Sequence, residues 1–258
     1  KAYGSYEALV KDVNVDAIYI ATPHTLHKEN TLLCLQHKKA VLCEKPFAMN
    51  LEEVTAMIAT AKEHNTLLME GLWTSFLPHY QYVLKLIRAN TYGKLLHLKA
   101  DFGFKAVLNF EDRLLKKELG GGSLLDVGIY PIYAALSTLG LPLSIEAKAT
   151  FFENGADSSC DLIFQYQDAK ADLQASLLKD TPSEAVFTFE EGVVNINSRF
   201  HQPTKVRLIE NGKEEIIDFN YSTLGYSYEI AHFNDLLRNN QKESDIMTFD
   251  FSKNILKT

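Results

Sequence analysis

The sequence predicts a chain in two parts, an α/β domain with a parallel sheet followed by an α+β domain with a large, mostly antiparallel open sheet. In the first 75 residues, short apolar runs alternate with longer amphipathic segments, which is the pattern of βαβ units. After Pro78, runs of period two separated by turn residues replace that alternation. A chain of 258 residues, 46% of them hydrophobic, is long enough to bury two cores. We therefore place the domains at 1–75 and 76–258.

The elements of the first domain follow from buried runs that end at turn signals. Ser5 and Asn50 have side chains that accept a hydrogen bond from a first helical turn, so each is an expected N-cap. The expected strands are 16–21, 40–43 and 66–70, and the expected helices are 6–10, 24–36 and 51–64.

The second domain is dominated by alternating strands, which we expect to pair antiparallel in one large sheet. Glu210-Asn211-Gly212-Lys213 is expected to be a hairpin turn. The expected strands are 95–104, 145–152, 159–165, 169–177, 185–190, 193–196, 205–210 and 214–219, with helices over 80–88, 123–139 and 228–238.

Charge and cysteine usage exclude several function classes. The formal net charge of −7 argues against binding nucleic acid or anionic membrane surfaces. No apolar run is long enough to cross a bilayer and no basic-then-apolar leader opens the chain, so we expect a cytoplasmic protein. The three cysteines have no paired spacing, which predicts buried free thiols and no metal site.

The first candidate for chemistry is Lys45, in the turn Glu44-Lys45-Pro46 that follows a buried strand. Ligands of open parallel sheets bind beyond the carboxyl ends of the strands. An ammonium there donates a proton or stabilises an oxyanion, and a cis bond before Pro46 would fix the turn. The alternative is a solvated lysine before a loop proline.

The second candidate is the pair Asp126 and Tyr130, which are four residues apart and therefore share a helix face after Gly120-Gly121-Gly122. A phenol beside an ammonium can take the proton of an alcohol while hydride leaves the same carbon. The alternative is an aspartate of the first helical turn beside a half-buried tyrosine.

The third candidate is Thr22-Pro23-His24 with His27, where backbone amides and a hydroxyl could meet the ribose or pyrophosphate of a nucleotide. Histidines at a helix start also serve as caps, so that interpretation stays open. The histidines without shared spacing are assigned to the surface or to packing: His37, His64, His97 and His201.

Five segments in order resemble the glucose-fructose oxidoreductase and inositol dehydrogenase (Gfo/Idh/MocA) family: DAIYIATPHTLHKEN, KKAVLCEKPFAMNLEEV, MEGLWTSFLPHY, GGGSLLDVGIYPI and GYSYEIAHFNDLL. Tyr130, where many members carry histidine, looks most like the dimeric dihydrodiol dehydrogenase branch. The resemblance implies an incomplete Rossmann domain at 1–75, a substrate-binding and oligomerisation domain at 76–258, and an NAD(P)-dependent dehydrogenase acting on a sugar, inositol or cyclic diol. It also implies a homodimer or higher homo-oligomer through the C-terminal sheet.

The resemblance assigns roles by position. The catalytic trio is Lys45, Asp126 and Tyr130. The residues that would contact NAD or NADP are Ala21, Thr22, Pro23, His24, His27, Glu44, Lys45, Pro46 and Trp73.

Two departures from the family pattern bear on this assignment. We expect the opening strand and the GxGxxG loop to precede residue 1, because nothing like them occurs in the chain. Ser75 stands where relatives often have arginine. The competing hypothesis is a catalytically silent binding or scaffold protein, which the absence of a GxGxxG strand upstream would favour. A hydrolase or metalloenzyme has little support, since HExxH and GxSxG are both absent.

Overall fold

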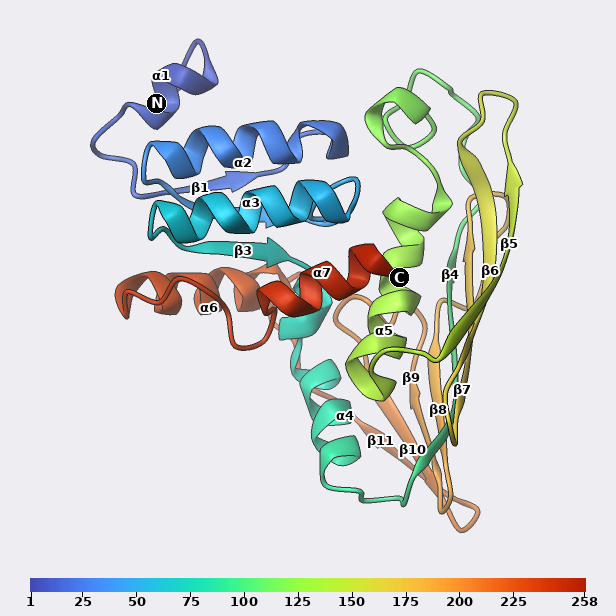
Figure 1. Cartoon of the computed structure of the whole chain (residues 1–258). Helices are drawn as coiled ribbons and strands as arrows, with labels where there is room; N and C mark the ends of the chain where they lie inside the picture. The colour runs from blue at the N-terminus through green and yellow to red at the C-terminus, as the bar shows by residue number, and fades with distance from the viewer. The chain divides into compact units, whose positions relative to one another are not determined.

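The computed structural model describes all 258 residues, which form two compact units (Figure 1). The parallel-sheet unit comprises residues 1–72, 118–120 and 228–258, and the large-sheet unit comprises 73–117 and 121–227. The division therefore differs from the single boundary predicted after residue 75. The chain returns to its first unit at the end, which a boundary drawn from composition alone does not reveal.

The parallel-sheet unit contains three strands in the order β1-β2-β3, all parallel. Two predicted N-caps are confirmed: Ser5 Oγ accepts from Ala8 N at 3.2 Å, and Asn50 Oδ1 accepts from Glu53 N at 2.9 Å. The elements are α1 (Tyr6–Val10), β1 (Ala17–Ile20), a 3₁₀ turn (His24–Leu26), α2 (His27–Gln36), β2 (Ala40–Glu44), α3 (Leu51–Glu63) and β3 (Leu68–Gly71).

Two C-terminal helices complete this unit, α6 (Tyr226–Arg238), whose residues from Tyr228 onward belong to it, and α7 (Phe249–Lys257). The sequence did not lead us to expect α7. Thr248 begins it by accepting from Phe251 N at 3.1 Å, and Phe249 enters the core shared by α2, α3 and β2. Burial of one apolar stripe thus holds a nine-residue helix that would be marginal alone.

The large-sheet unit is built on eight strands in the order β11-β10-β9-β8-β4-β7-β6-β5. All neighbouring pairs are antiparallel except β4 and β7, which are parallel, so the expectation of a mostly antiparallel sheet is confirmed. The turn at Glu210–Lys213 is also confirmed, with Asn211 and Gly212 at positive φ. The strands are β4 (Leu95–Gly103), β5 (Ser144–Phe151), β6 (Asp157–Gln165), β7 (Lys170–Ser176), β8 (Ala185–Phe189), β9 (Val193–Ile196), β10 (Val206–Glu210) and β11 (Lys213–Ile217).

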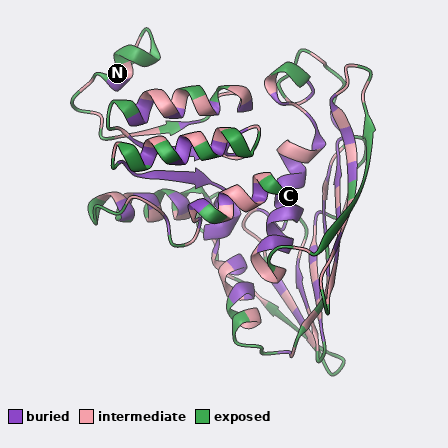
Figure 2. Ribbon diagram, in the orientation of Figure 1, coloured by how far each residue is buried: buried purple, intermediate pink, exposed green.

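Helices α4 (Pro78–Arg88) and α5 (Ile129–Leu139) lie on one side of this sheet, and no helix of the unit covers the other (Figure 1). Every residue of the edge strand β5 is exposed, whereas α5 is almost entirely buried against β4 and β7 (Figure 2). The expectation that no run is long enough to cross a bilayer is wrong for one stretch: Lys117–Leu139 is long and apolar enough, although 78% of its most apolar part is buried inside the fold.

Candidate active site

The loops that follow β1 and β2 leave the parallel sheet at the same edge. The strands pair with Ile20 opposite Cys43, so Ala21–His24 and Glu44–Pro46 emerge side by side. His27 joins them: its Nδ1 lies 2.8 Å from the carbonyl oxygen of Pro46 and its Nε2 lies 2.9 Å from that of Thr22. The structure therefore brings the predicted segments of this unit together.

The two histidines of this edge are engaged with the chain itself. Both ring nitrogens of the fully buried His27 face carbonyl oxygens, so this ring braces the two loops. His24 Nδ1 donates to Gly120 O at 3.1 Å, and its ring packs edge-on against His27 at 5.7 Å between centroids. A direct contact of either histidine with a nucleotide remains a prediction.

The turn Glu44-Lys45-Pro46 contains a cis peptide bond before the proline, as the sequence suggested. The Glu44 carboxylate fixes this turn, because one oxygen accepts from the Tyr19 hydroxyl and the other from Lys45 N at 3.2 Å. The backbone that carries Lys45 is thereby held at the carboxyl end of β2.

Two buried carboxyl groups at the end of β3 were not predicted. Glu70 accepts from Phe47 N at 3.2 Å and from the Ser252 hydroxyl at 2.5 Å, and burial raises its pKa to about 7. Glu229 is fully buried and neither of its oxygens has a hydrogen-bond partner. Burial, with the nearby charge of Glu44, raises the pKa of Glu229 to about 8.

In the large-sheet unit, Tyr130 lies in a continuous row of aromatic rings. Trp73 Nε1 donates a hydrogen bond to Tyr130 Oη at 3.1 Å, and the Trp73 indole stacks on Tyr226 at 4.4 Å. The Tyr130 ring also packs against His201 at 4.8 Å and Phe102 at 5.6 Å, and His201 stacks on Phe102 at 4.0 Å. We call these five residues the aromatic row.

The aromatic row places a polar donor on the oxygen of a buried phenol. Tyr130 is 5% exposed, and the Trp73 N–H opposite its oxygen stabilises negative charge there. Trp73, predicted as a cofactor contact, is thus a partner of Tyr130. Sequence reasoning missed Phe102 and Tyr226 as parts of this site and assigned His201 to the surface or to packing, because no local pattern links residues so far apart along the chain.

Asp126 lies in a turn of π-helix, Leu124–Gly128, which precedes α5. The predicted helix is therefore present but does not begin as regular α-helix, so the spacing of four residues does not by itself align Asp126 with Tyr130. Asp126 is 9% exposed and forms an ion pair with Arg113 at 3.4 Å, a partner that the sequence did not indicate. Lys45 belongs to one unit, and Asp126 and Tyr130 to the other.

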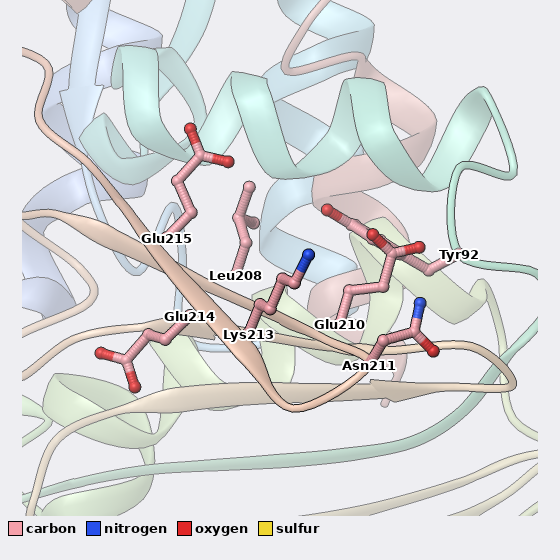
Figure 3. A pocket seen from close by; sticks show the side chains of 7 residues that line it. All are labelled: Tyr92, Leu208, Glu210, Asn211, Lys213, Glu214 and Glu215. Carbon is pink, nitrogen blue, oxygen red and sulfur yellow. The ribbon is translucent and has the colours of Figure 1, made fainter.

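A separate hollow lies along the β10–β11 hairpin (Figure 3). Its acidic side chains are exposed, and Glu214 and Glu215 point to opposite sides of their strand. It contains none of the predicted site residues, and no group of three or more His, Cys, Asp or Glu side chains is placed to hold a metal ion. Its lining residues are Tyr92, Leu208, Glu210, Asn211, Lys213, Glu214 and Glu215.

A parallel sheet with loops gathered at its carboxyl edge, in a chain with a second, large-sheet unit, is typical of a two-domain protein that binds a ligand beyond the ends of its parallel strands. Residues 1–72 match the model of the oxidoreductase family with an NAD-binding Rossmann fold (GFO_IDH_MocA), and residues 80–195 match the GFO/IDH/MocA C-terminal domain. The chain belongs to the Gfo/Idh/MocA family of NAD-binding oxidoreductases.

Relatives and solved structures agree with this placement. The chain is 38% identical to trans-1,2-dihydrobenzene-1,2-diol dehydrogenase of Xenopus tropicalis, over 96% of this chain and 77% of that protein. It is 32% identical to the enzyme of that name from Homo sapiens, over 98% of this chain and 78% of that protein. Aldose-aldose oxidoreductase from Caulobacter crescentus shares the fold with a TM-score of 0.90 at 23% identity, covering 99% of this chain and 78% of that one. A 3-ketoreductase from Actinomadura kijaniata, solved with NADP, gives 0.87 at 23% identity, covering 98% and 78%.

Proposed function

We propose that this protein is an NAD(P)-dependent dehydrogenase that oxidises a hydroxyl group of a cyclic diol, with Tyr130 as the residue that transfers the proton. The observation that carries the proposal is the hydrogen bond from Trp73 Nε1 to the buried Tyr130 Oη. A phenol oxygen with a fixed donor can hold the negative charge that proton transfer requires.

In the oxidation direction, Tyr130 Oη takes the proton of the substrate hydroxyl, and in reduction it returns it. A nicotinamide held at the carboxyl edge of the parallel sheet would supply the hydride chemistry at the same carbon. Lys45 is the proposed source of positive charge in the reaction, and Asp126, held by Arg113, is proposed to orient the substrate.

The parallel-sheet unit fits a dinucleotide at its carboxyl edge. The loops at Thr22–His24 and Glu44–Pro46 are fixed next to one another there, and the buried carboxyl group of Glu229, from α6, lies near the end of β3 without a hydrogen-bond partner. These loops would hold NAD or NADP at the place where open parallel sheets bind ligands.

The aromatic row supports a cyclic substrate with an apolar face. Tyr226, at one end of the row, is 44% exposed, so a ring surface is presented beside buried Trp73 and Tyr130. Flat aromatic walls bind rings by stacking and leave hydroxyl groups to polar side chains. The names of the relatives favour a cyclic diol, with sugars and inositols as the other substrates of the proposed class.

The test measures absorbance of reduced nicotinamide with the intact gene product, NAD or NADP, and a panel of cyclic diols, inositols and aldoses. Lys45→Met and Tyr130→Phe should each abolish turnover, whereas Lys11→Met and Tyr82→Phe, changes of the same kind outside the site, should not. An intact protein that neither reduces nor binds either dinucleotide would refute the dehydrogenase and favour a scaffold.

Exposed apolar side chains support a further part of the proposal, that two copies associate through the large-sheet unit. Leu143, Phe151 and Ile216 are 76%, 65% and 55% exposed, and such surfaces favour association. Light scattering should give the mass of a dimer or larger oligomer for wild type and a smaller mass for Phe151→Asp. We also propose a cytoplasmic location, which cell fractionation would test.

A further inference from the structure

His201 contacts three other rings of the aromatic row, those of Tyr130, Phe102 and Trp73. It is 7% exposed, its ring stacks on Phe102 with an interplanar angle of 19°, and it meets the Tyr130 ring at 40°. Removal of the imidazole would therefore open space directly beside the phenol whose oxygen receives the Trp73 N–H.

The backbone that carries His201 is fixed from several sides, although it belongs to a connection between strands. The buried Thr74 hydroxyl donates to His201 O at 2.8 Å, and Phe200 N donates to Ser183 O at 3.0 Å. His79 Nε2 lies 2.9 Å from Phe200 O, so this nitrogen donates to the carbonyl. Connections between strands are commonly mobile, and this one is held so that its histidine ring has a defined place.

His79 is itself held in one tautomer. Burial lowers its pKa to about 4, so the ring is neutral near pH 7 and has one N–H, which faces Phe200 O. Its Nδ1 then accepts from the Tyr221 hydroxyl at 2.6 Å. The network fixes the His201 segment by contacts that do not involve Tyr130.

We propose that His201 is a positioning residue, whose ring holds the Tyr130 phenol in the orientation that receives the Trp73 hydrogen bond. The inference extends the proposed function, since it concerns the same tyrosine. Small displacements of a reacting group lower rates steeply, so loss of the flat ring should reduce turnover far more than substrate or cofactor binding.

The experiment compares His201→Ala, His201→Leu and His201→Phe in the intact protein. We expect kcat to fall by about 10- to 100-fold in His201→Ala and His201→Leu, with KM and dinucleotide affinity changed by less than about threefold. His201→Phe keeps a stacked ring and should recover most of the lost kcat. Phe187→Leu, a buried change in β8, is the control for lost stability and should leave kcat unchanged.

A second readout does not depend on turnover. Trp73 is the single tryptophan of the 258-residue chain, so fluorescence excited selectively in tryptophan reports the environment of Trp73 alone. His201→Ala should shift the Trp73 emission in the same direction as Tyr130→Phe, and adding His201→Ala to Tyr130→Phe should produce less than the sum of the two shifts.

The outcomes separate the two proposals. Full kcat in His201→Ala or in His201→Leu, or a His201→Phe as impaired as they are, overturns the positioning role while the dehydrogenase stands. Full turnover in Tyr130→Phe overturns the assignment of proton transfer to Tyr130 and the positioning role together, because the tyrosine that His201 would position then takes no part in the reaction.

Discussion

The carboxyl group of Glu229 lies over Gly71 at the end of β3, so that a Cβ atom at position 71 would stand 3.5 Å from Oε2. The absence of a side chain at Gly71 leaves room for a carboxyl group that has no hydrogen-bond partner. A buried group of this kind is stable only in its neutral form, which explains the direction of its pKa.

The first prediction concerns pH and stability. The folded-state pKa of Glu229, about 8, lies above the ordinary value of 4.5, so the folded protein retains a proton that the unfolded chain has released. Its contribution to stability is complete below about pH 4.5 and is lost progressively as the pH rises to about 8. Glu70, with a pKa raised to about 7, acts in the same direction.

Glu229→Gln has the shape of the neutral acid but cannot ionise. Its free energy of unfolding should therefore match that of wild type at pH 5 and exceed it at pH 8 by a few kcal/mol, at about 1 kcal/mol per pH unit. Urea unfolding at both pH values measures the difference. Glu63→Gln, at an exposed position, is the control. Parallel pH profiles for wild type and Glu229→Gln would contradict the prediction.

The second prediction concerns the Trp73 donor. Trp73→Phe keeps an aromatic ring against Tyr226 but removes the N–H that faces Tyr130 Oη, so kcat should fall by about 3- to 10-fold, the equivalent of one neutral hydrogen bond. Steady-state kinetics with reduced-nicotinamide absorbance measure it. Tyr226→Leu, which removes the stack but not the donor, should retain more of kcat than Trp73→Phe. The reverse order would make stacking the more important contact.

Local sequence signals predicted most of the elements because each depends on neighbouring residues. Ser5 and Asn50 cap the helices they precede, and the buried run of β2 ends at the expected turn. The helix α7 was missed because its stability comes from burial against α3, a contact between distant segments. The same reason explains the parallel pairing of β4 with β7, since nothing in either strand specifies its neighbour.

The site was only partly predictable for the same physical reason. Tyr130, Lys45 and Asp126 were identified from their motifs and family resemblance, and their roles remain to be tested. Their partners were not identified. Arg113 forms an ion pair with Asp126, and His201 packs against Tyr130 although the two residues are far apart in the sequence. A histidine that packs among rings has the same local signature as one on a surface.

The third prediction concerns the start of the π-helical turn. Asp157 Oδ2 accepts from the Ser123 hydroxyl and from Leu124 N, each at 2.6 Å, and Gly122, at φ 142°, leaves the space that Asp157 occupies. A Cβ atom at position 122 would lie 2.1 Å from Asp157 Oδ1. Gly122→Ala should therefore displace the Asp157 carboxylate from Ser123 and Leu124 and shift the turn that carries Asp126.

We expect Gly122→Ala to lose about 2 kcal/mol or more of stability and, at temperatures where it remains folded, to have lower kcat. Gly212→Ala tests the conformational part alone, because its φ is also positive but no atom lies within 4 Å of the added Cβ. Chemical denaturation and kinetics on both variants distinguish the two effects. Equal stability losses would mean that strain at positive φ, and not the contact with Asp157, dominates.

The last prediction concerns His27, whose ring bridges the loops after β1 and β2. His27→Leu fills much of the same volume but leaves the carbonyl groups of Thr22 and Pro46 without this partner, so the parallel-sheet unit should lose about 2 to 4 kcal/mol of stability. The same loops are the proposed dinucleotide site, so loss of the bridge should also weaken binding and raise the Kd for NAD or NADP. The fluorescence of Trp73, which belongs to the large-sheet unit, should stay unchanged. His37→Leu, at an exposed position, provides the matched control. If His27→Leu keeps the stability and the dinucleotide affinity of wild type, the loops hold their positions without the His27 bridge. The bridging role of His27 would then be wrong.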